Sequence, residues 1–220
     1  MVTRTKLLIF INRVFKYCFI ILLFFMIITS CIKNDKENNS EKAIKLNKTI
    51  AKQIFDYNSI QSKDEKKLYQ ILNLVSKAIE LDNKNIFGYV NEASIYIKLG
   101  KYRDARLALQ KIIELKKDYP ELYLFIGILY EKEGDLNNAI ENYKKALAMF
   151  NDKLSMDKNN IDIEFNIIIS KIFVNSMSKQ TALKEVEKFS KGNVDKQKME
   201  LMKQTIINFN KEDFLKNISN

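Results

Sequence analysis

The fold of this chain is decided by two consecutive stretches of equal length. Residues 86–119 read IFGYVNEASIYIKLGKYRDARLALQKIIELKKDY, and residues 120–153 read PELYLFIGILYEKEGDLNNAIENYKKALAMFNDK. A fixed internal period of this length is typical of proteins built from stacked structural repeats. Similar residues recur 34 positions apart in these pairs: Tyr89 and Tyr123, Tyr96 and Tyr130, Gly100 and Gly134, Ala105 and Ala139, Ile113 and Leu147.

Each stretch divides into two helical halves with a glycine between them. The second half of the first stretch carries Ala105, Leu109 and Ile112 at helical spacing, so these side chains share one face. Gly100 and Gly134 stand where the first helix ends, and glycine suits that place because it can leave a helix in a left-handed conformation. The pattern predicts an all-α fold.

The two stretches resemble tetratricopeptide repeats (TPRs). The resemblance implies pairs of antiparallel helices joined by a tight turn, stacked into a right-handed superhelix and closed by a C-terminal capping helix. Ala93 and Gly127 occupy the small-residue position at which the helices of a pair approach each other. Glu92 departs from the family pattern, which prefers an apolar residue there, and Ile112 stands where the family prefers alanine.

The composition agrees with this fold and excludes several functions. Among 220 residues there are 5 glycines, 1 proline and no histidine, so histidine-based catalytic systems and histidine zinc sites are ruled out. Acidic residues form no convergent cluster, and we expect no catalysis, no metal ion and no cofactor. We predict that the acidic side chains are solvated, for example Asp56, Asp64, Glu131 and Glu133.

The basic charge does not indicate nucleic-acid binding. The formal net charge is +10, but beyond residue 30 the basic residues are lysines apart from Arg103 and Arg106. Lysine lacks the planar fork that recognises phosphates and bases with two bonds. Recurrent tyrosines could suggest a stacking surface, but their 34-residue period predicts that they are core residues of the repeats.

Helical patterns flank the two clear repeats. Residues 43–81 form a degenerate first repeat, with a capping box expected at 62–65 and a second helix over 68–81. The stripe of its first helix comprises Leu46, Ile50, Ile54 and Tyr57.

Beyond residue 153 the register breaks by about nine residues, and we expect them to lengthen the preceding helix through residues 149–156. The apolar residues 161–176 and a short helix with Ala182, Val186 and Phe189 form the next pair. A last helix is predicted to cap the repeats with Met199, Met202, Ile206 and Phe209.

The N-terminus is predicted to be an export signal. Residues 1–30 carry four basic residues, no acidic one, and an apolar run too short for a permanent membrane span. The run ends in Ile28, Thr29, Ser30 and Cys31, which resembles a bacterial lipobox. The resemblance implies cleavage before Cys31 and acylation of its sulfur, while an uncleaved anchor is the alternative. Residues 31–42 would then be a flexible tether, because they contain too few apolar residues to fold.

In the TPR family, the first helix of each repeat lines a concave groove that binds peptides. The lysine and asparagine clamp by which the family binds acidic peptide carboxylates is absent, so the groove would suit an apolar or amphipathic segment. Alternatively, the chain fills this groove with its own terminal helices. The groove positions in this sequence are Val90, Ser94, Ile97 and Lys98 in the first repeat, and Leu124, Ile128, Glu131 and Lys132 in the second.

These observations predict three segments and one role. Residues 1–30 are a signal peptide, residues 31–42 a tether, and residues 43–217 a helical repeat domain. We expect a lipoprotein held at a bacterial cell membrane or outer membrane, exported to the periplasmic or surface face, and binding a protein partner there. By resemblance, the partner would belong to a cell-envelope or outer-membrane protein assembly complex. The alternative is a periplasmic protein that binds a hydrophobic small ligand in the groove.

Overall fold

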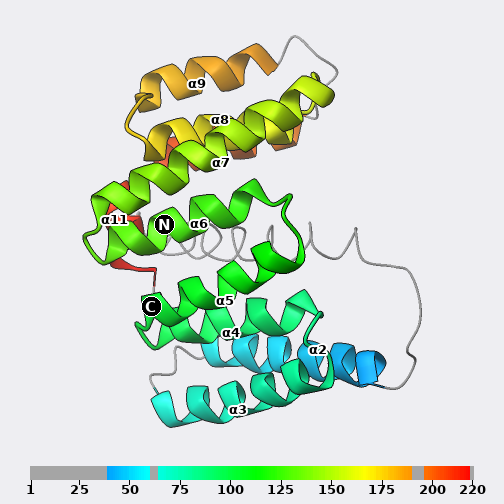
Figure 1. Ribbon diagram of the computed structural model, residues 1–220. Helices are drawn as coiled ribbons and strands as arrows, with labels where there is room; N and C mark the ends of the chain where they lie inside the picture. Colours follow the sequence, from blue (N-terminus) through cyan, green and yellow to red (C-terminus); the bar gives the residue numbers. More distant parts are fainter. Residues whose placement is uncertain (1–38, 60–63, 190–195, 219–220) are drawn as a thin grey trace. The chain divides into compact units, whose positions relative to one another are not determined.

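The computed structural model describes residues 39–59, 64–189 and 196–218, and within these ranges the chain forms helices and no strand. The signal peptide, Cys31 and residues 31–38 of the tether lie outside the described residues. Residues 39–42, predicted to belong to the flexible tether, instead form the start of α2. The all-α prediction is confirmed (Figure 1). The helices in chain order are α2 (Asn39–Ser59), α3 (Glu65–Leu81), α4 (Ile86–Lys98), α5 (Tyr102–Leu115), α6 (Pro120–Lys132), α7 (Leu136–Met156), α8 (Ile161–Phe173), α9 (Lys179–Lys188), α10 (Lys196–Asn208) and α11 (Lys211–Lys216).

Their contacts divide these helices into two compact units. The N-terminal unit contains α2 to α5, and the C-terminal unit contains α7 to α11 together with α6 from Tyr123 onward. In the N-terminal unit, α2 packs against α3 and α4, and α4 packs against α5. In the C-terminal unit, α7 packs against α8, and α9 packs against α8 and α10.

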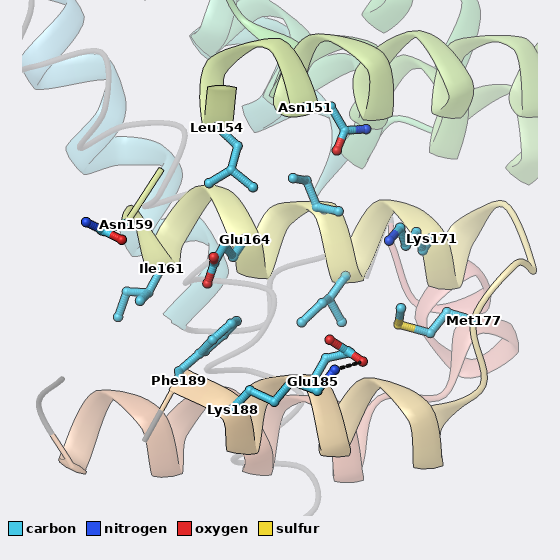
Figure 2. Close-up of a pocket in the computed structure, with 12 residues that line it drawn as sticks. Asn151, Leu154, Asn159, Ile161, Glu164, Lys171, Met177, Glu185, Lys188 and Phe189 are labelled. Atoms are coloured by element: carbon cyan, nitrogen blue, oxygen red, sulfur yellow. Dashed lines mark hydrogen bonds and ion pairs between the residues drawn. The ribbon is translucent and has the colours of Figure 1, made fainter. Parts of the chain in front are cut away.

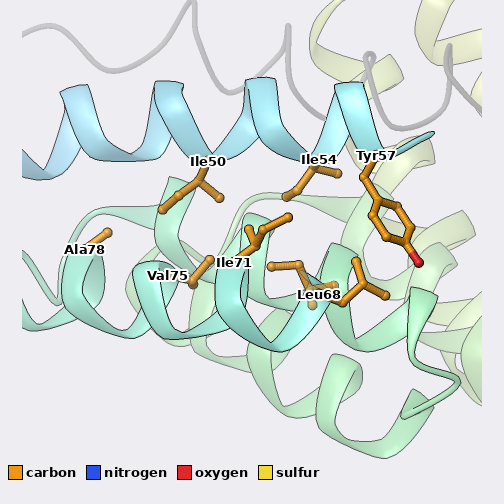
Figure 3. Close-up of a cluster of buried hydrophobic side chains, with 8 residues drawn as sticks. Ile50, Ile54, Tyr57, Leu68, Ile71, Val75 and Ala78 are labelled. Atoms are coloured by element: carbon orange, nitrogen blue, oxygen red, sulfur yellow. The ribbon is translucent and has the colours of Figure 1, made fainter. Parts of the chain in front are cut away.

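The core of the N-terminal unit joins one face of α2 to one face of α3 (Figure 3). The stripe predicted on α2 faces this core, with Ile50, Ile54 and Tyr57 buried and Leu46 packed against them. Each fully buried aliphatic side chain here contributes about 1.5–3 kcal/mol of transfer free energy. The α3 side chains in this cluster are Leu68, Ile71, Val75 and Ala78.

The start of α3 differs from the predicted capping box. The N-cap is Asp64, whose carboxylate accepts the backbone N–H of Lys67 at 3.2 Å. The helix therefore begins at Glu65, and Asp64 has a structural role where a purely solvated side chain was expected. Ser62, the other expected capping residue, lies outside the described residues.

The turn glycines adopt the conformation that the sequence predicts. The φ angle is +68° at Gly100 and +84° at Gly134, and a Cβ at either place would meet nothing within 4 Å. After each glycine the chain reverses through a backbone bond that spans the turn: Lys101 N–H donates to Tyr96 O at 2.8 Å, and Asp135 N–H to Tyr130 O at 3.0 Å. This arrangement terminates α4 and α6 in the same way.

Gly127 marks a close crossing between α6 and α7. A Cβ at this position would lie 2.5 Å from Cε1 of Tyr143 and 3.0 Å from the carbonyl oxygen of Ala139. Tyr143 itself is fully buried. The predicted need for a small residue is therefore confirmed at Gly127.

The extra residues after the second repeat lengthen α7, as predicted. This helix has 21 residues where α5 has 14, and its last turn ends in Met156, which is 85% exposed. The next pair follows as α8 and α9, and Ala182 and Val186 are buried. The extension thus carries the end of α7 beyond the part of the helix that is buried.

The C-terminal cap is divided into two helices where one was predicted. Met202 and Ile206 of α10 are buried as expected, and Phe209 is buried just beyond the helix. The break has a local cause: the side chain of Asn210 accepts the backbone N–H of Asp213 at 3.1 Å, and thereby caps the start of α11.

Candidate functional site

The groove positions of the first repeat lie along α4 of the N-terminal unit. Val90, Ser94 and Lys98 are partly exposed, whereas Ile97 is buried. Residues spaced four apart on a helix lie on one face. Val90 and Ser94 therefore leave an accessible strip of mixed apolar and hydroxyl character.

A buried pair of amides lies beside this strip. The Asn91 side-chain N–H₂ donates to the side-chain oxygen of Asn47 at 3.0 Å, and links α4 to α2. Both residues are nearly inaccessible to solvent. The sequence analysis did not identify this pair, although one signal was present: Asn47 interrupts the buried stripe of α2 between Ala43 and Ile50.

The groove positions of the second repeat, on α6 of the C-terminal unit, are closed. Leu124 is 2% exposed and Ile128 is fully buried. The Lys132 ammonium donates to the backbone carbonyl of Lys216, in α11, at 3.2 Å. Leu124 and Ile128 therefore leave no side-chain surface for a partner, and Lys132 is bonded to α11. This favours the alternative that the chain fills this part of the groove itself.

Glu131 is the centre of a polar network in the same unit. One of its carboxylate oxygens accepts the Tyr143 hydroxyl at 2.7 Å, and the other pairs with the Lys211 ammonium at 2.8 Å. The side chains of Glu131 and Lys211 are only 13% and 19% exposed. The prediction that Glu131 is a solvated side chain is therefore wrong, because its partner comes from the distant helix α11.

Lys211 also contacts the end of α8. Its ammonium donates to the carbonyl oxygen of Phe173 at 3.0 Å and lies 5.6 Å and 5.5 Å from the ring centroids of Tyr143 and Phe173. A cation within about 6 Å of an aromatic face is attracted by the electron density of the ring. A carboxylate, a carbonyl and two rings thus surround one ammonium group.

An aromatic cluster continues from this network. The Phe173 ring lies 5.2 Å from Tyr143, 5.5 Å from Phe209 and 6.1 Å from Phe214, measured between centroids. Burial and the bond to Glu131 both raise the pKa of the Tyr143 hydroxyl, so it remains a hydrogen-bond donor at neutral pH. Tyr143 is thus both a core residue and a donor to Glu131. The recurrent tyrosines, predicted to be core residues, are only partly buried: Tyr89, Tyr96, Tyr123 and Tyr130.

A separate pocket opens between α7, α8 and α9 in the C-terminal unit (Figure 2). Its volume is about 790 Å³. Buried Ile167 and Ile168 form part of its wall, while Glu185 and Lys188 form an ion pair of 2.6 Å at its edge. Burial raises the pKa of Glu164, which also lines the pocket. The remaining lining residues are Asn151, Leu154, Asn159, Ile161, Lys171, Met177 and Phe189.

Outside the network and the pocket, one carboxyl group on α4 has a shifted pKa. Burial, and then the charge of Asp104, raise the pKa of Glu92, the residue at which the first repeat departs from the family pattern. Among the described residues, no three His, Cys, Asp or Glu side chains are placed so that they could hold a metal ion. The notable groups are therefore the accessible strip on α4, the closed network around Glu131 and the pocket at α8.

Helix pairs joined through a positive-φ glycine, with a small residue at the crossing, define a helical-repeat protein. Comparison with known families agrees: residues 88–119 and 120–153 each match the family model described as tetratricopeptide repeat. These two stretches are therefore TPRs.

Curated relatives match a limited length of this chain. DnaJ homolog subfamily C member 3 of Bos taurus is 34% identical over 80 residues, which cover 36% of this chain and 16% of that protein. Hsp70-Hsp90 organizing protein 1 of Glycine max is 31% identical over 84 residues, covering 33% of this chain and 15% of that protein. The chain therefore spans a small part of the length of these relatives. The crystal structure of MamA aligns with 70% of this chain and 82% of MamA at 24% identity, with a TM-score of 0.45.

Proposed function

We propose that this protein is a bacterial lipoprotein whose TPRs hold a protein partner within a cell-envelope or outer-membrane protein assembly complex. The observation that carries the proposal is the partly exposed strip of Val90, Ser94 and Lys98 on the inner helix of a TPR. One similar protein is named as an organizer of two other proteins, Hsp70 and Hsp90, which supports a scaffold role. The proposed role requires no catalysis.

Site-specific crosslinking in the native membrane tests the partner. A photoreactive residue at Ser94 should capture one defined protein, whereas the same residue at the exposed Gln110 on α5 should not. Capture of the same protein with equal yield at both positions would contradict binding at the strip. With the photoreactive residue kept at Ser94, Val90→Asp should abolish the capture, because a carboxylate placed against an apolar partner is costly.

The lipid anchor is supported by the motif that ends in Cys31, which lies outside the described residues. Within the described part of the chain, no helix combines the length and hydrophobicity that crossing a bilayer needs. Several acyl chains together give durable attachment, since each buried methylene contributes about 0.8 kcal/mol. Labelled palmitate should enter the wild-type protein and not Cys31→Ala. Incorporation into both would show that the lipid is elsewhere.

A second candidate, binding of a hydrophobic small ligand, is favoured by the pocket at α8 rather than by the groove. Its apolar wall and volume of about 790 Å³ suit a small apolar molecule. Native mass spectrometry of the purified chain should then show a bound compound that is lost in Leu154→Asp. Only the mass of the protein itself in every preparation would exclude this candidate.

A further inference from the structure

The short helix α11 shows what kind of group the second repeat binds. It has six residues, none of which is fully buried. Its first residue, Lys211, nevertheless reaches Glu131, Phe173 and Tyr143 with the distances given above. Phe214, one helical turn later, places its ring 6.1 Å from Phe173 and 5.7 Å from Phe209. We call the set Glu131, Tyr143 and Phe173 the ammonium site.

The ammonium site requires a cation. The Tyr143 hydroxyl orients the carboxylate of Glu131, and the second carboxylate oxygen is satisfied by an ammonium. A carboxylate that is 13% exposed and has lost its cation keeps most of its desolvation cost without the compensating attraction. The site is therefore complementary to a lysine and disfavours an occupant without a positive charge.

The helix α11, which occupies the ammonium site in this structure, is too short to be stable by itself. A helix of six residues is far shorter than the 12–15 or so residues that make an isolated helix stable in water, so α11 depends on its contacts. Its attachment benefits from being part of the same chain, which raises its effective concentration at the site. A longer helix with the same pair of side chains would bury more apolar surface and could take its place.

We propose that the ammonium site binds a helix of the protein partner that carries a lysine followed three residues later by an aromatic residue, and that α11 occupies the site until the partner displaces it. Charge complementarity and the chain's own Lys211 and Phe214 define this occupant. The inference rests on the proposed scaffold function and adds the chemistry of the segment that is recognised.

The test uses a fluorescent peptide with the sequence of residues 205–218, TIINFNKEDFLKNI, and the full chain. Phe214→Ala in the protein weakens the hold of α11 and leaves the ammonium site intact. The peptide should bind this variant at least about tenfold more tightly than wild type, because the competing segment is loosened. No difference between the two proteins would overturn the displacement of α11.

The charge requirement is tested on the peptide, so that folding of the protein is not affected. Norleucine in place of the peptide's Lys211 should weaken binding at least about tenfold, since a charge-assisted bond is lost. Norleucine at Lys216, which is exposed, is the matched control and should change little. Equal loss with both peptides, or no loss with either, would overturn the ammonium site.

A variant of the protein gives the reciprocal result. Glu131→Gln, combined with Phe214→Ala, should abolish binding of the peptide while thermal melting shows a folded chain. If the double variant does not fold, the two norleucine peptides still decide the matter. Capture of a partner at Ser94 together with failure of every peptide would refute this inference and leave the proposed scaffold function standing.

Discussion

The two TPRs share a period and differ in what their inner helices present. At equivalent positions, Ser94 of α4 is partly exposed and Ile128 of α6 is fully buried. Three residues further on, Ile97 is a core residue in the first repeat, whereas Glu131 in the second is tied to α11. One repeat motif can therefore give an accessible surface and a closed one, depending on what packs against its inner helix.

The largest difference in the free energy of unfolding is expected between substitutions at these two inner positions. Ile128→Asp should destabilise the chain by more than about 4 kcal/mol, because it buries an unpaired carboxylate. Ser94→Asp should cost at most about 1 kcal/mol, because the side chain can reach water. Urea denaturation followed by circular dichroism measures both. Similar midpoints would show that the two inner faces are equally accessible.

The helix crossing of the second repeat should be nearly as sensitive. Gly127→Leu should cost about 3 kcal/mol, at the upper end of the usual range for over-packing, because even a Cβ would lie 2.5 Å from the ring of Tyr143. Lys144→Leu, on the exposed side of α7, is the control and should stay within about 0.5 kcal/mol. Comparable urea midpoints for the two variants would place residue 127 away from the crossing.

The hydroxyl of Tyr143 distinguishes the second repeat from the first, where Leu109 occupies the equivalent position. Tyr143→Phe should cost about 1.5–3 kcal/mol, the usual worth of a hydrogen bond to a charged group. Tyr123→Phe, which keeps the ring beneath Lys145, serves as the control and should change the free energy of unfolding little. A loss of the same size in both variants would mean that the bond to Glu131 contributes nothing specific.

The turns should behave alike in the two repeats. Gly100→Ala and Gly134→Ala should each cost about 1–2 kcal/mol, because both residues have positive φ and no neighbour crowds them. Thermal melting of the two variants would show the similarity. A loss at only one glycine would contradict a common turn.

The smallest effect concerns Glu92, which stands where the second repeat has Ile126. Its raised pKa means that the native chain binds this proton more tightly than the unfolded chain. Stability from this residue is therefore lost as pH rises from the ordinary value of 4.5 through the raised pKa. Glu92→Gln should remove that part of the pH dependence in urea titrations, and Glu141→Gln, at an exposed position, should not.

The sequence alone determined the helical repeats and their turns. A period of 34 residues, the glycines at Gly100 and Gly134, and the length inserted before residue 161 predicted the α4–α5 and α6–α7 pairs and the long α7. These features depend on local conformational preference and on side chains a few residues apart. Each helix and turn can therefore be predicted from its own residues, and comparison of consecutive 34-residue stretches gives their order.

The closure of the second repeat was decided only by tertiary structure. Glu131 and Lys211 are far apart in the chain, and neither differs in type from a solvated surface residue, so no local pattern predicts their ion pair. The same holds for Asn47 and Asn91, which meet between α2 and α4. The sequence therefore predicted where the inner helices lie, whereas long-range packing, which brings a particular cation to a particular carboxylate, decided which of their side chains are accessible to a partner.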